Sequence, residues 1–135
     1  MKKARGMVLS VMILFSLFGV VGCGDTAEGG ETLGYEQITA EEAKEIMDSE
    51  RDYVILDVRT VEEFSEGHIE GAVLLSYEDI RAKAHVVLPD KDRLILVYCR
   101  SGRRSKIAAE ELADLGYTNI KEFGGILDWP YGTVK

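Results

Sequence analysis

Two short, continuous runs of apolar residues constrain the fold of this chain more than any other feature. They are YVILD at 53–57 and RLILVY at 93–98. Runs of this length that are rich in Val, Ile and Leu are typical of strands buried on both faces, which occur mainly in parallel sheets. The sequence therefore predicts a sheet whose central strands are covered on both sides.

Segments with helical spacing separate and flank these runs. Thr39 and Glu42 form a capping box that predicts a helix over 40–49. Strands that alternate with helices predict an α/β fold, with a central, mainly parallel β-sheet flanked by helices. The other predicted elements are a helical turn at 61–64, a helix near 77–84, a helix with Ala108, Leu112 and Leu115 on one face that ends at Gly116, and a strand at 119–123.

Length and charge limit the classes of partner. The chain has 135 residues, with 24 acidic and 16 basic side chains and a formal net charge of −8. This length suits one domain, and an acidic surface repels phosphate backbones, so no nucleic-acid partner is expected. Cys23 and Cys99 form neither a disulfide framework nor a CxxC pair, and with two histidines no metal site is expected.

The first 25 residues have the pattern of a targeting segment. Lys2, Lys3 and Arg5 precede an uncharged, apolar run that ends in VVGC at 20–23. This ending resembles the bacterial lipobox, in which the cysteine is lipidated and becomes the mature N-terminus. The alternative is an uncleaved membrane anchor, since about 18 apolar residues can span a bilayer. Both interpretations place the protein in the bacterial cell envelope, outside the cytoplasmic membrane.

The pattern divides the chain into three parts. We expect residues 1–22 to be a lipoprotein-type signal peptide and Cys23 to be the lipidated residue that anchors the protein to a membrane. Residues 23–35 are rich in Gly and acidic side chains and predict a flexible tether. Residues 36–135 form the predicted globular domain.

The segment CRSGRRS at 99–105 directly follows the second apolar run. A cysteine there lies at the carboxyl end of a strand, ahead of a helix, where open α/β sheets bind ligands. The amides of such a loop and the positive end of the helix favour the thiolate of Cys99, which is the reactive form. The alternative is a buried structural cysteine, which needs no Gly102 for close backbone approach. Basic side chains that can attract an anionic substrate are those of Arg100, Arg103, Arg104 and Lys106.

Several motifs together resemble a single-domain rhodanese over roughly residues 36–130. They are Asp57-Val58-Arg59, Glu62-Glu63-Phe64, Gly67-His68-Ile69, Gly71-Ala72, the 99–105 loop, and Gly116-Tyr117 followed by Gly124-Gly125 and Trp129.

The resemblance implies a thiosulfate sulfurtransferase with the α/β rhodanese fold. Cys99 would attack the outer sulfur of a small anionic donor such as thiosulfate, release sulfite and hold a persulfide. A thiol, cyanide or a sulfur-accepting protein would then take the sulfur, with no metal or organic cofactor. The expected substrate-binding residues are Arg100, Ser101, Gly102, Arg103, Arg104 and Ser105, and the expected structural supports are Asp57, Arg59 and His68.

Two other functions remain open from the sequence. One is an envelope-anchored sulfur carrier or binding module that has an intact Cys99 but no free turnover. The other is a cysteine-dependent phosphatase or arsenate reductase. The phosphatase signature places Arg six positions after Cys, whereas here Ser105 is the sixth residue and Arg104 comes one position earlier. The shorter loop favours sulfur transfer.

Overall fold

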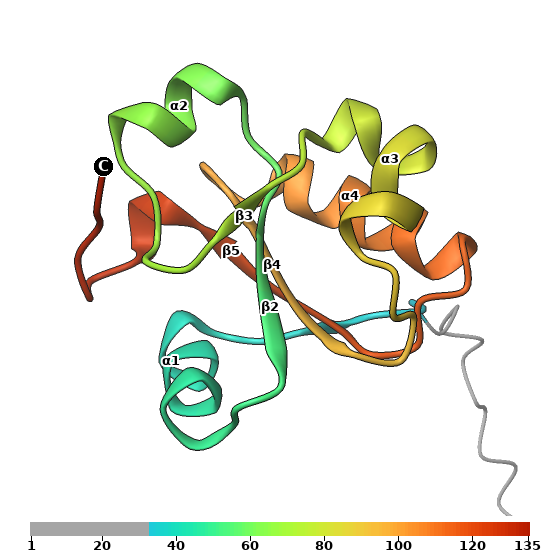
Figure 1. Ribbon diagram of the computed structural model, residues 1–135. Helices are drawn as coiled ribbons and strands as arrows, with labels where there is room; N and C mark the ends of the chain where they lie inside the picture. The colour runs from blue at the N-terminus through green and yellow to red at the C-terminus, as the bar shows by residue number, and fades with distance from the viewer. Residues whose placement is uncertain (1–32) are drawn as a thin grey trace, which may run out of the picture. The chain divides into compact units, whose positions relative to one another are not determined.

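The computed structural model describes residues 33–135 (Figure 1). The predicted signal peptide, Cys23 and most of the predicted tether lie outside the described residues. None of the helices within residues 33–135 is long and apolar enough to span a membrane. The elements are β1 (Glu36–Gln37), α1 (Ala40–Ser49), β2 (Tyr53–Asp57), α2 (Val61–Glu66), β3 (Val73–Leu74), the 3₁₀ turn η1 (Tyr77–Asp79), α3 (Ile80–Val87), β4 (Leu94–Cys99), α4 (Arg103–Asp114), β5 (Ile120–Gly125) and the 3₁₀ turn η2 (Ile126–Asp128).

The five strands form one sheet in the order β1-β5-β4-β2-β3, and every neighbouring pair is parallel. The predicted α/β fold with a central parallel sheet is therefore confirmed. β4 is the central strand. It pairs with β2 on one side and with β5, the next strand along the chain, on the other. Cys99 ends this central strand, at the place where such sheets bind ligands.

Helices cover both faces of the sheet (Figure 1). Alternation along β4 sends Ile95, Val97 and Cys99 into the core beneath α3 and α4. Leu96 and Tyr98 point to the opposite face, where they pack in the core that α1 covers. α2 follows the carboxyl end of β2, so the sheet positions it beside the end of β4.

The predicted elements are present with small changes in their limits. The predicted helix over 40–49 matches α1, and its capping box is present in both directions between Thr39 and Glu42. The helix expected near 77–84 begins as the turn η1 and continues as α3 to Val87. β5 runs on to Gly125 because this glycine pairs with Cys99. Tyr35, assigned to the end of the tether, is buried in the core.

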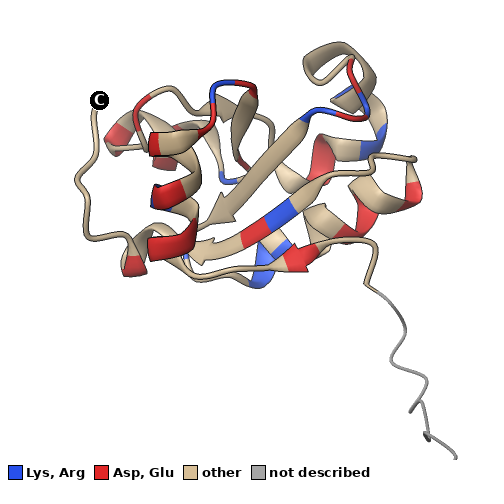
Figure 2. Ribbon diagram, turned by 90° about the horizontal axis from the view of Figure 1, so that it is seen from below, with Lys and Arg blue, Asp and Glu red and all other residues tan. Residues whose placement is uncertain are grey.

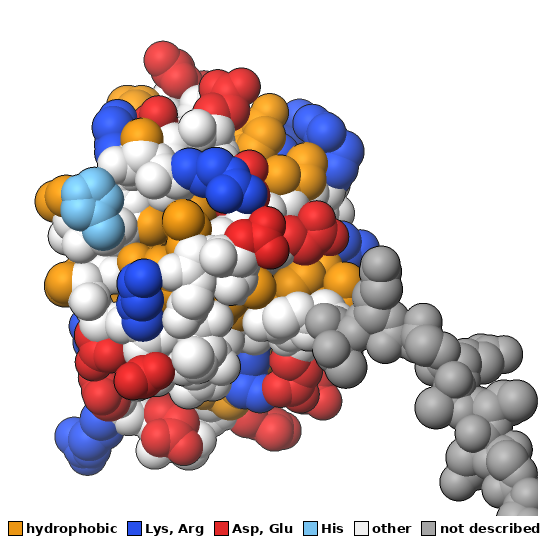
Figure 3. Space-filling model, turned by 90° about the vertical axis from the view of Figure 1, so that its right-hand side faces the viewer, with side chains coloured by type: hydrophobic (Ala, Val, Ile, Leu, Met, Phe, Trp, Pro, Cys, Tyr) orange, Lys and Arg blue, Asp and Glu red, His pale blue; other side chains and the backbone are white. Residues whose placement is uncertain are grey.

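Charged side chains are spread over the surface of the domain. Acidic residues are prominent on α1 (Figure 2). The face that carries α3 and α4 mixes charges of both signs with small apolar areas (Figure 3). There Arg81 of α3 forms ion pairs with Glu111 and Asp114 of α4, which joins the two helices.

Candidate active site

Cys99 is buried at the point where β4 meets the loop before α4. Cys99 is 1% exposed. Its Sγ accepts a hydrogen bond from the backbone amide of Gly102 at 3.0 Å. Gly102 is the N-cap of α4 and has φ = +105°, a conformation that favours glycine. The loop thus turns an amide and the positive end of a helix toward the sulfur, as the sequence predicts for a site that stabilises an anion.

Ser105 connects the sulfur to β5, the strand that pairs with β4. The Sγ of Cys99 lies 3.4 Å from the Oγ of Ser105, which is fully buried in the first turn of α4. The Ser105 hydroxyl lies 2.6 Å from Oε1 of Glu122, a buried residue of β5. The same carboxylate oxygen accepts the amide of Gly124 at 2.8 Å. A carboxyl group therefore lies two hydrogen bonds away from the candidate nucleophile.

The backbone at the end of β5 packs directly against the backbone of the loop that follows Cys99. A Cβ added at Gly125 would lie 1.9 Å from the carbonyl oxygen of Arg100, a distance that no side chain tolerates. The amide of Leu127 donates to the same carbonyl at 3.2 Å. Glycine at position 125 therefore allows the close approach that fixes the path of the chain after Cys99.

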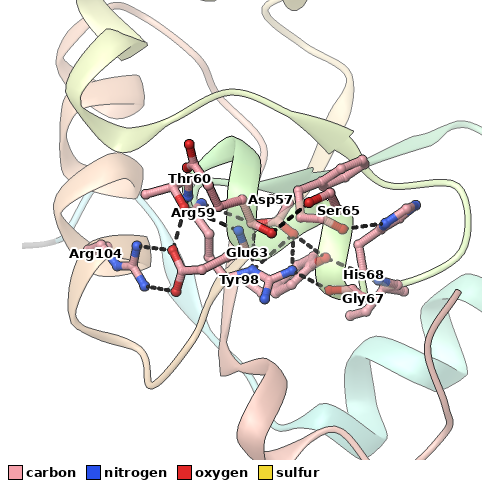
Figure 4. A network of polar contacts seen from close by, with 12 residues as sticks. Asp57, Arg59, Thr60, Glu63, Ser65, Gly67, His68, Tyr98 and Arg104 are labelled. Carbon is pink, nitrogen blue, oxygen red and sulfur yellow. Dashed lines mark hydrogen bonds and ion pairs between the residues drawn. The ribbon is translucent and has the colours of Figure 1, made fainter. Parts of the chain in front are cut away.

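Arg104 contacts an acidic residue of α2. Its two terminal nitrogens donate to the two carboxylate oxygens of Glu63 at 2.7 and 2.8 Å (Figure 4). These bonds lower the pKa of the Glu63 carboxyl to about 2 and raise the pKa of Arg104. The charge of Cys99 also raises the pKa of Arg104, whose hydrogen-bonding fork is occupied by Glu63. Among the other predicted binding residues, the side chains exposed to solvent are those of Arg100, Ser101 and Arg103.

A buried ion pair supports the neighbouring strand end. Nε and Nη2 of Arg59 donate to the carboxylate of Asp57 at 2.7 to 3.1 Å, and Nη2 also reaches the carbonyl of Gly67 at 2.7 Å (Figure 4). The hydroxyl of Tyr98 donates to Asp57 at 2.6 Å. Burial and this bond raise the pKa of Tyr98. Burial alone would lower the pKa of Arg59, but its bonds to Asp57 raise it. The cluster joins β2, β4 and the turn after α2.

His68 lies in the turn after α2, next to the Arg59 cluster. Its recorded contacts are with Phe64 and Val134 and not with Cys99. Its ring stacks on Phe64 with centroids 3.7 Å apart, and Nδ1 lies 2.9 Å from the carbonyl of Phe64. Its backbone pairs with that of Val134 in an antiparallel bridge. These contacts close the turn after α2 against the C-terminal segment.

A cleft of about 450 Å³ adjoins the Cys99 loop. Its lining comes from α2, the loop and η2, and includes Arg59, Glu63, Arg100 and Leu127. Leu127 is 65% exposed although it is apolar. The cleft therefore lies beside the loop, between charged side chains and an apolar one.

Within residues 33–135 no three His, Cys, Asp or Glu side chains gather as they would around a metal ion. The predicted sites omit two residues that the structure places close to the loop, Glu63 as the partner of Arg104 and Glu122 as the partner of Ser105. Alternation along β5 carries a signal for Glu122, because it shares a face with the buried Ile120. The pairing of Glu63 with Arg104 spans 41 positions and has no local signal.

Comparisons with known proteins agree with this geometry. The family model described as a rhodanese-like domain matches residues 39–130. The thiosulfate sulfurtransferase PspE of Escherichia coli is 34% identical over 80 residues, which are 59% of this chain and 77% of PspE. YrkF of Bacillus subtilis, described by its name as a sulfur carrier, is 34% identical over 94 residues, 69% of this chain but only 50% of YrkF. A solved structure of a rhodanese with anions from E. coli aligns with a TM-score of 0.58 and 32% identity, covering 62% of this chain and 98% of that one.

Proposed function

The chain belongs to the family of rhodanese-like domains, as its motifs predict, and we propose that it is a sulfurtransferase that carries sulfur on Cys99. The observation that carries the proposal is the position of Sγ, which accepts the Gly102 amide at the start of α4. A persulfide at this position extends the sulfur by one atom and remains an anion, which loop amides and a helix N-terminus stabilise. The similarity to the thiosulfate sulfurtransferase PspE supports the same chemistry.

The reaction runs in two half-reactions. The Cys99 thiolate attacks the outer sulfur of thiosulfate, the S–S bond of the donor breaks, and sulfite leaves with the electron pair. A nucleophilic acceptor, such as cyanide or a thiolate, then attacks the outer sulfur of the persulfide and returns Cys99 to the thiolate. Each half-reaction forms one bond and breaks one, so neither needs a separate oxidant or reductant.

The residues around Cys99 have different roles in this reaction. The amide of Gly102 stabilises the anionic sulfur, and the charge of Arg104 adds to that stabilisation. The exposed Arg100 lines the cleft beside the loop and is placed to attract an anionic donor. The ion pair between Asp57 and Arg59 supports the neighbouring end of β2 and the turn after α2.

Mass spectrometry tests the first half-reaction directly. After incubation with thiosulfate, the peptide that contains Cys99 should gain the mass of one sulfur atom, and cyanide should remove it. A Cys99→Ala chain treated in the same way should gain nothing. A protein with folded, reduced Cys99 that never gains this mass would exclude the proposal.

A sulfur carrier is the second candidate, because YrkF is among the similar proteins. A carrier holds the same persulfide but delivers it to one protein partner. It therefore gains the sulfur from a donor and loses it slowly to cyanide or to small thiols. The rate of release to small acceptors separates the carrier from the freely turning-over enzyme.

We also propose that the protein is exported and held at a membrane of the bacterial cell envelope by a lipid on Cys23. The proposal rests on the VVGC pattern at 20–23 and on the basic and apolar segments before it. Mass spectrometry of the protein from its native envelope should find a diacylglyceryl group on an N-terminal Cys23. An unmodified chain that starts at Met1 and remains in the membrane would instead identify an uncleaved anchor.

A further inference from the structure

Glu122 is a buried acidic residue to which the proposed sulfur transfer assigns no role. It is 2% exposed and lies on β5, on the face that α4 covers. Its Oε1 accepts hydrogen bonds from Ser105 at 2.6 Å and from the amide of Gly124 at 2.8 Å. A carboxyl group that is this buried is costly to the fold unless its charge is compensated or shared.

The hydroxyl of Ser105 links this carboxyl group to Cys99. A hydroxyl has one hydrogen to donate and two lone pairs to accept with. The carboxylate of Glu122, at 2.6 Å, is the nearest acceptor of the Ser105 hydrogen, while the carbonyls of Gly102 and Gly124 lie at 3.0 and 3.3 Å. The Ser105 oxygen is then free to accept the hydrogen of the Cys99 thiol at 3.4 Å.

The charged groups around the pair favour one negative charge rather than two. From α4, Arg104 acts on Cys99, but it is bound to Glu63 of α2. The residues that pair with Glu122 on β4 and β1 are Val97 and Gln37, which are uncharged. α1 packs against the other face of the sheet, toward which Phe123 points. Two anions this close in a buried site disfavour each other.

We propose that Cys99 and Glu122 share one proton through the hydroxyl of Ser105, and that Glu122 is the positioning residue that holds it while Cys99 is an anion. When the proton moves, the S–H bond of Cys99 breaks and its proton passes to the oxygen of Ser105. The hydrogen of Ser105 passes to Oε1 of Glu122. The products are a thiolate and a carboxylic acid, so the net charge of the pair stays at one negative charge.

This arrangement deepens the proposed function, on which its role in turnover rests. The thiolate that attacks a sulfur donor becomes a persulfide anion, and both anions occupy the same position. Glu122 keeps the proton through both half-reactions, so the buried site has the same charge in each step. The proton sharing itself needs no sulfur donor and can be measured without one.

The test is the rate at which iodoacetamide alkylates Cys99 as a function of pH, in the full chain. Trypsin cleaves after Arg93 and Arg100, so mass spectrometry follows Cys99 in its own peptide, apart from Cys23. Two ionisable groups that interact by more than about one pK unit lose their protons in two steps that belong to the pair. The unsubstituted chain should show two steps, and Glu122→Gln should show the loss of one. Glu36→Gln, on the neighbouring strand, should keep both.

A single step in both the unsubstituted chain and Glu122→Gln overturns the proposal. If Glu122→Gln does not fold, infrared spectroscopy of the unsubstituted protein decides. Alkylation at neutral pH converts the Cys99 thiolate into a neutral thioether. Glu122 then no longer lies beside a negative charge and should release its proton to solvent, so the band of a protonated carboxyl group should be lost. No change in that band overturns the proposal. Both readouts are independent of sulfur transfer, so an inactive protein that shows two steps would contradict only the proposed function.

Discussion

Arg104 donates both terminal nitrogens of its guanidinium group to Glu63, at 2.7 and 2.8 Å. This pair connects the first turn of α4 to α2 (Figure 4). The sequence predicts that Arg104 binds substrate, but its fork is used to hold two elements together. We propose that Arg104 contributes to the chemistry through the position of the loop and a positive charge near Cys99.

Arg104→Lys should lower sulfur transfer by about 10- to 100-fold, because lysine keeps the charge but cannot make the two parallel bonds that position the loop. The matched control is Arg81→Lys, an arginine of α3 that also pairs with carboxylates but lies outside the loop, which should stay within about twofold of the original rate. Steady-state rates with thiosulfate and cyanide measure both. An Arg104→Lys variant that keeps the original rate would show that charge alone matters.

Glu63→Gln should destabilise the domain by about 1 kcal/mol at neutral pH, because a partly buried bidentate ion pair is lost. The pKa of Glu63 is about 2 in the folded protein, below its ordinary value of 4.5. Its stabilising contribution is therefore complete above pH 4.5 and is lost as the pH falls toward 2. Urea unfolding at about pH 6 and about pH 3 should show a smaller difference between the variant and the original chain at the lower pH. A difference that grows at low pH would contradict this account.

Asp57→Asn should cost about 3–5 kcal/mol of unfolding free energy, because it leaves the buried guanidinium of Arg59 without its carboxylate. Tyr98→Phe removes a single hydrogen bond to the same carboxylate and should cost about 1–3 kcal/mol. Chemical denaturation measures both values. The interpretation fails if the loss of the Tyr98 hydroxyl destabilises the domain more than the loss of the carboxylate.

Gly125→Ala should abolish sulfur transfer, because the new Cβ would overlap the carbonyl oxygen of Arg100 at 1.9 Å and displace the loop. Gly124→Ala is the neighbouring control. At Gly124 a Cβ meets no atom within 4 Å, although φ = +86° strains an alanine there by about 1–2 kcal/mol. Activity and thermal unfolding of the two variants separate displacement of the loop from backbone strain.

Local signals explain which parts of this structure the sequence predicts well. The limits of α1 follow from the capping box between Thr39 and Glu42, whose hydrogen bonds form within one turn. The placement of Cys99 follows from a buried strand that a glycine-containing loop ends. Both signals depend on neighbours in the sequence, so they can be found without the fold.

Partners that are distant in the sequence explain the rest. The contact of Arg104 with Glu63 depends on how the end of β2 meets the end of β4, which the sequence does not specify locally. The role of Gly125 depends on the register of β5 against Cys99. The same register brings Glu122 beneath Ser105, so a charged residue in a short strand becomes part of the Cys99 site.

The most direct measurement is the rate of thiocyanate formation from thiosulfate and cyanide, by the chain and by its Cys99→Ala variant, with folding checked by circular dichroism. The account predicts steady turnover by the original chain and a loss of at least about 1,000-fold in the variant, because the nucleophile is gone. Turnover that survives in folded Cys99→Ala would contradict the central claim that Cys99 carries the sulfur.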